Sequence, residues 1–396
     1  MLSIPFRFGL RNDRWTKCID VMLEKKQDVR QIHQLRIIGL LEADFNTALK
    51  IYFAKKMITN SELVELSEEQ WGGRPGRTAT DPAMRKLLAF EYGRAIYVTI
   101  GLFANDAMAC YDRMVPDIST IIARKFGMAP SIMKARNLVM KAMKHHVKTQ
   151  HGVSSTFYTQ TPNEPIMAGE TQGKADPACL WNLESQTLLQ THQQIHDGIN
   201  LASANGERSI QKNNDAFVND CNGIASKHCP TFEASEHATR LHLKSGAQKW
   251  SQLITATGGG IAFHKCGWMM CAFEPNTWPP KLKKQPDDEI RLANQHGHDT
   301  IIKKMDCDKP NKGLGCHQAV DGNMTTELEH RTDQCHTLAN RIRGPRVTLR
   351  EAHTLMDSRV IPTVTYSMPL TSFTQKECKN LNTIIDKTMV NKYRYN

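Results

Sequence analysis

Two acidic stretches, over a hundred residues apart in the chain, constrain the fold most strongly. The first begins at Asp106, one residue after the largely apolar run 96–104, and the second is Phe217-Val218-Asn219-Asp220. Each run predicts a buried strand that delivers a carboxylate at its end. A buried, ionised carboxylate needs a paired charge or a metal. Two such strands side by side would form a site of oxygen ligands for divalent cations.

Spacing decides which of these carboxylates can cooperate. On one extended strand, Asp106 and Asp112 would lie roughly 20 Å apart, at about 3.3 Å per residue. The two ions of a two-metal site lie only about 3.5–4 Å apart. Asp106 therefore needs a partner from elsewhere, and Asp220 is the best candidate. Ordinary explanations remain open, because Asn-Asp is common in turns and Asp often follows a strand as a cap.

The charge balance favours a polyanionic partner. The 396 residues carry a formal net charge of +11, which suits nucleic acid or an acidic membrane face, or belongs to a protein that is merely basic. No apolar run approaches the roughly 18 residues that span a bilayer, and residues 1–10 lack the apolar core of a signal peptide. We therefore expect a soluble intracellular protein, cytoplasmic or nuclear, without a membrane partner.

The cysteines and histidines do not have the spacing of a structural zinc site. Among 11 Cys and 16 His there is no Cys-x-x-Cys, and structural zinc usually takes two close pairs of ligands. His192 and His196 lie four apart on a predicted helix, but Gln193 stands where a zinc protease has Glu. We expect reduced, structural thiols and no structural zinc.

Hydrophobic periodicity predicts a mainly helical chain with a few strands. The predicted helices are 11–26, 44–57, 82–91, 116–126, 132–147, 180–189 and 234–255, and the predicted strands are 34–40, 96–104, 154–161 and 261–268. Residues 197–214 are predicted to form an exposed loop. The segment 276–288, rich in Pro and Lys, marks a boundary between lobes.

Three segments suit phosphate contacts. Gln70–Arg77 contains three Gly, one Pro and two Arg, so its backbone N–H groups could meet phosphate, although it could equally be a surface turn. Gly169–Pro177 is a second glycine-bearing loop, placed before a helix. The basic cluster around Lys144 and Lys148 could also face phosphates, or form a solvated helix face.

The order of these motifs resembles that of the reverse transcriptases of non-long-terminal-repeat-type retrotransposons, over most of residues 11–390. Five segments carry the resemblance: Gln70–Arg77 as the fingers motif; Asp106, Tyr111 and Asp112 as the first palm motif; Gly169, Gln172 and Gly173 as the Gly-x-x-Gln-Gly element; Phe217–Asp220 as the aromatic-x-Asp-Asp motif; and Lys265, after Gly-Gly, as the lysine of the fourth palm motif.

The resemblance implies an α+β, right-hand polymerase fold. Residues 1–95 would form the fingers, 96–275 a palm of antiparallel sheet backed by helices, and 276–396 a helical thumb and connection. A finger-like insertion would lie within the palm at about 113–165. The implied activity is templated addition of deoxynucleotides to a primer 3′ end. Its partners would be an RNA template, a DNA primer, dNTPs and other domains of the element's polyprotein.

The resemblance also implies a role for each site residue. Asp106 and Asp220 would hold two Mg²⁺ ions, with Mn²⁺ as a substitute, and Asn219 would lie beside them. Lys265 would donate a proton to the leaving pyrophosphate. The remaining roles concern the nucleotide: Arg74 and Arg77 would grip the triphosphate, Tyr111 would exclude a 2′-OH, and Gln172 with Gly173 would let the backbone approach the templating pair.

Three departures from the family pattern indicate a degenerate copy. Asn219 replaces the first, metal-binding Asp of the acidic pair, which leaves the site one negative charge short. Pro177 comes one residue early and without the usual Ser, and Gly73 replaces an aromatic residue. We expect a folded polymerase domain with impaired synthesis, from one part of a longer element. The alternative is a non-catalytic nucleic-acid-binding remnant of a mobile element.

Overall fold

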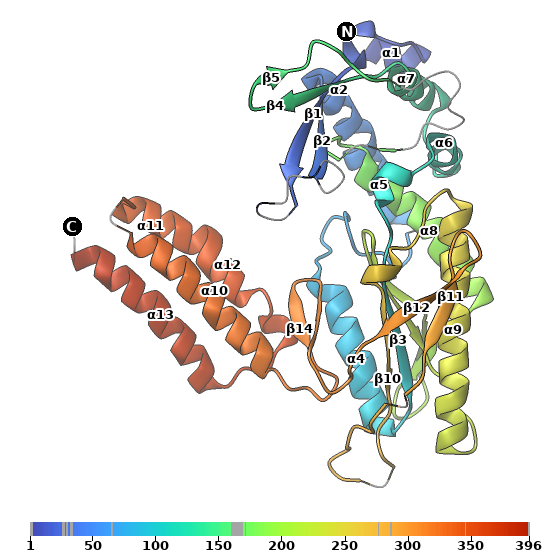
Figure 1. The fold of residues 1–396 in the computed structure, drawn as a ribbon, viewed down its shortest axis with the longest axis vertical. Helices are drawn as coiled ribbons and strands as arrows, with labels where there is room; N and C mark the ends of the chain where they lie inside the picture. The colour runs from blue at the N-terminus through green and yellow to red at the C-terminus, as the bar shows by residue number, and fades with distance from the viewer. Residues whose placement is uncertain are drawn as a thin grey trace.

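The structure is a computed structural model that describes residues 3–25, 28, 31, 35–64, 66–159, 169–170, 172–275, 277–285, 287–344 and 346–394. Its mixture of helices and strands confirms the α+β class. Figure 1 shows three parts: an N-terminal sheet with its helices, a central sheet between helices, and a C-terminal helical bundle that projects sideways. Within the described ranges, no helix combines the length and apolar character needed to span a bilayer.

The N-terminal sheet is four-stranded, in the order β2-β1-β4-β5. Its strands are β1 (Lys17–Glu24), β2 (Leu35–Leu41), β4 (Lys144–Thr149) and β5 (Gly152–Val153). β1 pairs antiparallel with β2 and parallel with β4, so the sheet joins distant parts of the chain. The neighbouring helices are α1 (Ser3–Phe8), η1 (Asp13–Thr16), α2 (Ala43–Leu49), η3 (Lys50–Met57), α3 (Ile58–Val64), α6 (Pro116–Lys125) and α7 (Pro130–Lys141).

One predicted helix in this region, 11–26, is wrong, and another, 132–147, ends earlier than predicted. Residues 13–24 form a short 3₁₀ turn and then β1, in which Cys18 and Asp20 are buried two residues apart. The apolar residues have helical spacing, and the buried Asp20 interrupts the alternation of apolar and polar residues by which a strand is recognised. Residues 144–147 leave α7 and enter β4, because β1 offers them a pairing partner. Of the predicted strand 154–161, Tyr158 makes one bridge to His145, and 160–161 lie outside the described residues.

The central sheet is six-stranded, in the order β11-β12-β10-β3-β9-β8. Its strands are β3 (Ile100–Asp106), β8 (Asn214–Phe217), β9 (Asp220–Ala225), β10 (Gly267–Cys271), β11 (Ile290–Ala293) and β12 (Asp299–Lys304). On one face, Leu102 packs with Phe90 of α4 (Thr80–Ile96). On the other lies α9 (Phe232–Ala256), whose Trp250 Nε1 donates to Asn105 Oδ1 at 3.0 Å. The helix α8 (Pro177–Ile195) packs against α9.

Several boundaries around this sheet differ from expectation. The predicted helices 180–189 and 234–255 are confirmed within α8 and α9. β3 starts at Ile100 rather than at Ile96, because α4 continues to Ile96. Asp106 is therefore the last residue of the strand. Lys265 lies in the 3₁₀ turn η4 (Phe263–Lys265), before β10, and the predicted loop 197–214 contains the hairpin β6 (Ile199–Ala202) and β7 (Ser209–Lys212).

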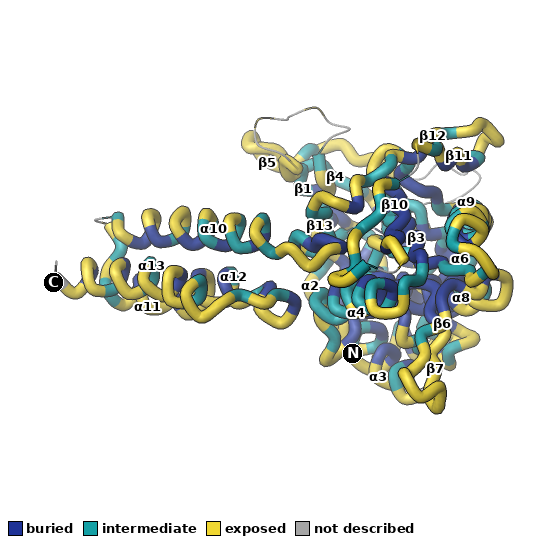
Figure 2. Tube along the Cα trace, turned by 90° about the horizontal axis from the view of Figure 1, so that it is seen from below, coloured by how far each residue is buried: buried dark blue, intermediate teal, exposed yellow. Residues whose placement is uncertain are grey.

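The C-terminal bundle has its own core and is anchored to the central part. It consists of α10 (Thr325–Arg343), α11 (Leu349–Leu355), η5 (Met356–Val360), α12 (Ile361–Thr365), η6 (Met368–Leu370) and α13 (Gln375–Arg394). Figure 2 shows it extending away from the sheets, with buried residues along α10. A hairpin of β13 (Asn311–Gly313) and β14 (Cys316–Gln318) connects it to α4, since Gln318 Nε2 donates to the Ala83 carbonyl at 2.9 Å.

Candidate active site

The register of β3 and β9 brings the two acidic stretches together. Asp106 and Asp220 are directly paired across these antiparallel strands. Directly paired residues project to the same face, with Cβ atoms about 4.5–5.5 Å apart. Four residues along, Leu102 and Ile224 form another such pair on that face and pack with α4. Asp220 is more exposed than Asp106, so the pair lies at the solvent-facing end of the face that α4 covers.

Asn219 and Lys265 both contact the carboxylate of Asp106. Asn219 Nδ2 donates to Asp106 Oδ1 at 2.5 Å, and Lys265 Nζ forms an ion pair with Oδ2. Backbone bonds hold both segments in place: Ala107 N–H donates to the Asn219 carbonyl at 3.0 Å, and Ala262 N–H to the Asp106 carbonyl at 2.9 Å. Four residues that the sequence predicted for catalysis therefore surround one point.

The electrostatics of this point favour a cation. Partial burial raises the pKa of Asp220 above its ordinary value, and the facing Asp106 carboxylate raises it further, against the opposing effect of Lys265. The carboxylates of Asp106 and Asp220, when ionised, carry two negative charges, and the ammonium group of Lys265 neutralises only one of them. Because carboxylate and amide oxygens suit hard divalent ions, the donor set fits Mg²⁺ or Mn²⁺.

The tip of the β8–β9 hairpin is held in an unusual conformation. Val218 has φ +58°, which costs free energy for a β-branched residue. Its N–H donates to Gln70 Oε1 at 3.1 Å, and its carbonyl accepts from Trp181 Nε1 at 2.6 Å. Gly72 lies so close that a Cβ there would come 2.3 Å from the Val218 nitrogen. Gln70 belongs to the fingers motif, but no sequence signal pointed to Trp181.

The two arginines of the fingers motif differ in availability. Arg74 is buried, and its Nε and Nη2 each contact a Glu62 carboxylate oxygen at 2.6 Å, so it offers no free fork to a triphosphate. In this structure Glu62 therefore occupies the guanidinium group of Arg74, and the phosphate contact of Arg74 stays a prediction. Arg77 is more exposed; it pairs with Glu68 at 2.9 Å and lies 4.8 Å from the centre of the Trp71 ring. Its phosphate contact stays a prediction.

Two of the other predicted nucleotide contacts, Gln172 and Gly173, lie against β2 of the N-terminal sheet. The Gln172 carbonyl accepts from Gly39 N–H of β2 at 2.7 Å. Gly173 has φ +106°, and a Cβ there would come 2.7 Å from the Gly39 carbonyl oxygen. Thr171, between them and Gly169, lies outside the described residues. Tyr111 lies on α5 (Cys110–Arg113), where burial raises its pKa to about 12. The roles of these three residues toward a nucleotide stay predictions.

A buried ionic network, which the sequence did not reveal, borders the glycine element. Arg136 of α7 pairs with Asp176 at 2.6 Å and also with Glu170, and Lys174 pairs with the same Glu170. All four side chains are buried, and their charges cancel. In the sequence they are indistinguishable from surface charges. The network joins α7 to the start of α8.

Glu184 of α8 makes stability depend on pH. Its side chain is buried, with Oε2 3.4 Å from Ser119 Oγ, and burial raises its pKa to about 7. Since the pKa is higher in the folded state, this group stabilises the fold below its ordinary pKa, and that contribution is lost as pH rises through 7.

Glu184→Gln should therefore be more stable than the native chain at pH 8, by roughly 2 kcal/mol, and much closer to it at pH 5. Urea denaturation at the two pH values measures this. The exposed Glu329→Gln is the control, and an equal effect of Glu184→Gln at both pH values would contradict the assignment.

No protein-family model and no curated protein matches the sequence. Among solved structures, the chain is similar to telomerase from Candida Tropicalis in complex with a TWJ fragment of telomeric RNA (TM-score 0.45, 9% identity, covering 96% of this chain and 58% of that chain). It is also similar to the corresponding complex from Candida albicans (0.42, 10%, 96% and 59%) and to a truncated apo telomerase from Candida Tropicalis (0.41, 15%, 65% and 51%). The chain thus spans 51–59% of these telomerases. At such TM-scores the similarity carries no conclusion about activity.

Proposed function

We propose that this chain is a reverse-transcriptase-like domain that binds an RNA template and a DNA primer and adds deoxynucleotides weakly. The observation that carries the proposal is the direct pairing of Asp106 with Asp220, with Asn219 and Lys265 on the same carboxylate. A chance match of motifs in an unrelated basic protein does not require these residues to meet. The resemblance of the motifs to non-long-terminal-repeat-type retrotransposons supports the finer assignment.

The proposed chemistry divides between bound cations and the side chains of this chain. Asp106 and Asp220, with the amide oxygen of Asn219, would hold two Mg²⁺ or Mn²⁺ ions, which neutralise the triphosphate and lower the pKa of the primer 3′-OH. In the structure the amide of Asn219 donates to Asp106, so its oxygen must turn toward a cation. Lys265, which pairs with Asp106 in the structure, would release it and give a proton to the departing pyrophosphate.

The proposed domains of the chain are those of a right-hand polymerase fold. Residues 1–95 would form the fingers, 96–275 the palm with its insertion at about 113–165, and 276–396 the thumb and connection. The position of β4 in the N-terminal sheet supports an insertion that belongs to the fingers in space; residues 160–165 lie outside the described ranges. Two details cross these boundaries: α4 packs on the central sheet, and β11 and β12 extend it.

Metal binding and primer extension test the proposal. We expect Mn²⁺, detected by electron paramagnetic resonance, to bind the native chain and to lose affinity in Asp106→Ala. On poly(A)/oligo(dT), the native chain should add dTTP slowly with Mg²⁺ or Mn²⁺, and Asp106→Ala should abolish the addition. Asp299→Ala, on β12, provides a control carboxylate in the same sheet. Mn²⁺ binding that is unaffected by Asp106→Ala would overturn the metal assignment.

A non-catalytic nucleic-acid-binding remnant is the second candidate. One observation favours it: both carboxylate oxygens of Asp106 are already engaged, by Asn219 and Lys265. A protein that only binds would keep the basic surface and need no metal. Incorporation that depends on Mg²⁺ and on Asp106 distinguishes the two functions.

Both functions predict binding to primer–template that weakens steeply with salt. The exposed Lys144 and Lys148 lie on β4, which pairs with β1. If each contacts one phosphate, Lys144→Gln and Lys148→Gln should each lower the slope of log affinity against log salt by about 1. Fluorescence anisotropy between low and moderate salt measures the slope. Lys309→Gln is the control, because Lys309 pairs with Asp306 at 2.7 Å, and slopes unchanged in all three variants would exclude β4 from the interface.

A further inference from the structure

Asp20 is a buried carboxylate with little to neutralise it. Its side chain, in the middle of β1, is fully buried. Among the described residues, the only ion-pair partner found for it is His145, which is charged only when protonated. A buried carboxylate is costly unless a positive charge accompanies it. A cation bound at this site would therefore neutralise the negative charge of Asp20.

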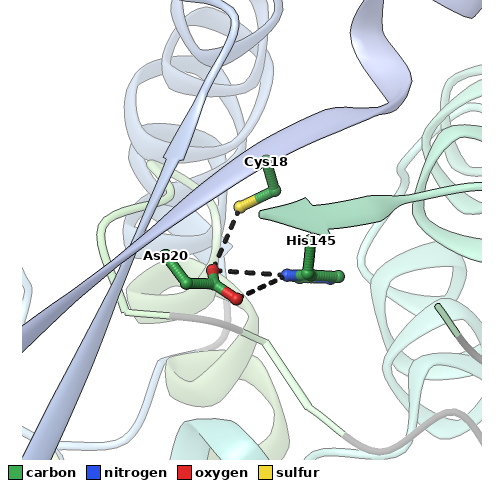
Figure 3. Close-up of side chains that lie close together, drawn as sticks. All are labelled: Cys18, Asp20 and His145. Carbon is green, nitrogen blue, oxygen red and sulfur yellow. Dashed lines mark hydrogen bonds and ion pairs between the residues drawn. The ribbon is translucent and has the colours of Figure 1, made fainter. Parts of the chain in front are cut away.

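Strand pairing places two further metal-binding side chains beside this carboxylate. Cys18 lies two residues before Asp20, so both project to the same face of β1, and Cys18 is paired with His145 across the parallel strands β1 and β4. Figure 3 shows the three side chains converging, with contacts from Asp20 to both of the others. A thiol, a carboxylate and an imidazole from two strands thus meet at one point.

The distances fit a tetrahedral ion. Cys18 Sγ lies 3.4 Å and His145 Nδ1 lies 3.3 Å from the same oxygen, Asp20 Oδ1. All three ligand atoms lie within 4.8 Å of one another. Bonds of about 2.0–2.3 Å in a tetrahedral zinc site put neighbouring ligand atoms roughly 3.3–3.8 Å apart. Small side-chain shifts would therefore bring these three atoms into coordinating positions.

We propose that Cys18, Asp20 and His145 bind one Zn²⁺ ion, with water in the fourth position. A thiolate, a carboxylate and a neutral imidazole balance the two positive charges of zinc, so the buried site becomes neutral. The mixture of sulfur, nitrogen and oxygen donors suits zinc better than Mg²⁺ or Ca²⁺. Tyr158 supports the site from outside, because its hydroxyl donates to Asp20 Oδ2 and orients that carboxylate.

Binding requires the loss of one proton. Burial and, to a smaller extent, the neighbouring Asp20 carboxylate together raise the pKa of the Cys18 thiol to about 12. Burial also opposes ionisation of Asp20, but hydrogen bonds from His145 and Tyr158 outweigh it and lower the pKa of this carboxyl. The S–H proton is therefore the one that zinc replaces. Zinc affinity should fall as pH falls, because protons compete for the sulfur.

The proposed ion would join β1 to β4. Asp20 and His145 are 125 residues apart in the chain, so the metal would add a link between strands that are already joined by backbone pairing and by the Asp20–His145 contact. Sequence spacing did not predict this site, because two of its ligands are separated by one residue and the third comes from a distant strand. None of the three residues belongs to the proposed polymerase site.

Metal content and cobalt spectroscopy on the full chain test the proposal. The native chain, purified with Zn²⁺ and then freed of loose metal, should retain about one equivalent, and Co²⁺ in its place should give a thiolate-to-cobalt charge-transfer band. Cys18→Ser should lose both signals. Cys335→Ser, which removes a buried thiol in the C-terminal bundle, should keep them. Absence of the charge-transfer band from the native chain would overturn the proposal even if Cys18→Ser fails to fold.

A milder variant separates ligation from folding. Tyr158→Phe leaves all three ligands in place and removes only the hydrogen bond to Asp20, so zinc affinity should fall roughly 10–100-fold. His146→Gln, one residue from the proposed ligand, should leave affinity unchanged. Asp106→Ala should also retain the zinc, which separates this site from the polymerase site. Unchanged zinc affinity in Tyr158→Phe together with loss in His146→Gln would overturn the ligand assignment.

Discussion

Replacing Asn219 by aspartate should raise Mg²⁺-dependent nucleotide incorporation by roughly two orders of magnitude. The side chain of Asn219 contacts Asp106 Oδ1, so a carboxylate there would face the same cations and supply the missing negative charge. If this charge lowers the barrier by about 3 kcal/mol, the rate rises about 100-fold. Primer extension on poly(A)/oligo(dT), compared with the native chain under the same conditions, measures the gain.

Two controls define what such a gain means. Asn222→Asp adds the same charge three residues after Asn219, within β9 and opposite Ala104, and should give little activity. Asp106→Ala combined with Asn219→Asp should return incorporation to background. Without metal, a third carboxylate should also lower thermal stability through repulsion, and Mg²⁺ should restore it. No gain in activity would show that Asn219 is not the limiting defect.

Replacing Arg136 by methionine should lower the free energy of unfolding by about 3–5 kcal/mol, the range expected when one partner of a buried ionic network is removed. The change leaves Glu170 with Lys174 alone and leaves the buried Asp176 without its partner at 2.6 Å. Methionine preserves most of the volume, so the loss reports on charge and hydrogen bonds rather than on a cavity. Urea denaturation, followed by circular dichroism, measures it.

Matched variants separate the network from arginine in general. Arg124→Met, at an exposed position of α6, should change stability by no more than about 0.5 kcal/mol. Arg136→Lys keeps the charge but cannot reach both Glu170 and Asp176 with one fork, so its loss should be intermediate. A loss below about 1 kcal/mol for Arg136→Met would mean that the network is not stabilising.

The sequence was most informative where local pattern and chemistry agreed. Apolar runs that end in acid predicted that Asp106 and Asp220 come from strands, and their strand pairing does place them together. The long helices α8 and α9 were predicted for the same reason, since their periodicity matches their burial. The meeting of Lys265 with Asp106 followed from the order of the motifs rather than from periodicity, because Lys265 lies in a turn and not in a strand.

The sequence failed where a polar side chain is buried or a partner is distant. Asp20 is fully buried in β1, which hid the alternation of that strand and led to a predicted helix. The contact of Arg74 with Glu62 was also missed, because nothing in the sequence around Arg74 indicated that Glu62 would bind its guanidinium group. In both cases tertiary contacts decide the role of a charged residue, and single-sequence patterns do not record such contacts.

The parallel pairing of β1 with β4 also determines when the N-terminal sheet can form during translation. β1 leaves the ribosome long before the residue that partners it, and Asp20 must await His145, 125 positions later. At a translation rate of about 5–20 residues per second, that interval lasts on the order of ten seconds, and during it one edge of β1 lacks its pairing strand. When this protein is expressed at a high rate or at elevated temperature, we expect partly folded intermediates that aggregate and that depend on chaperones.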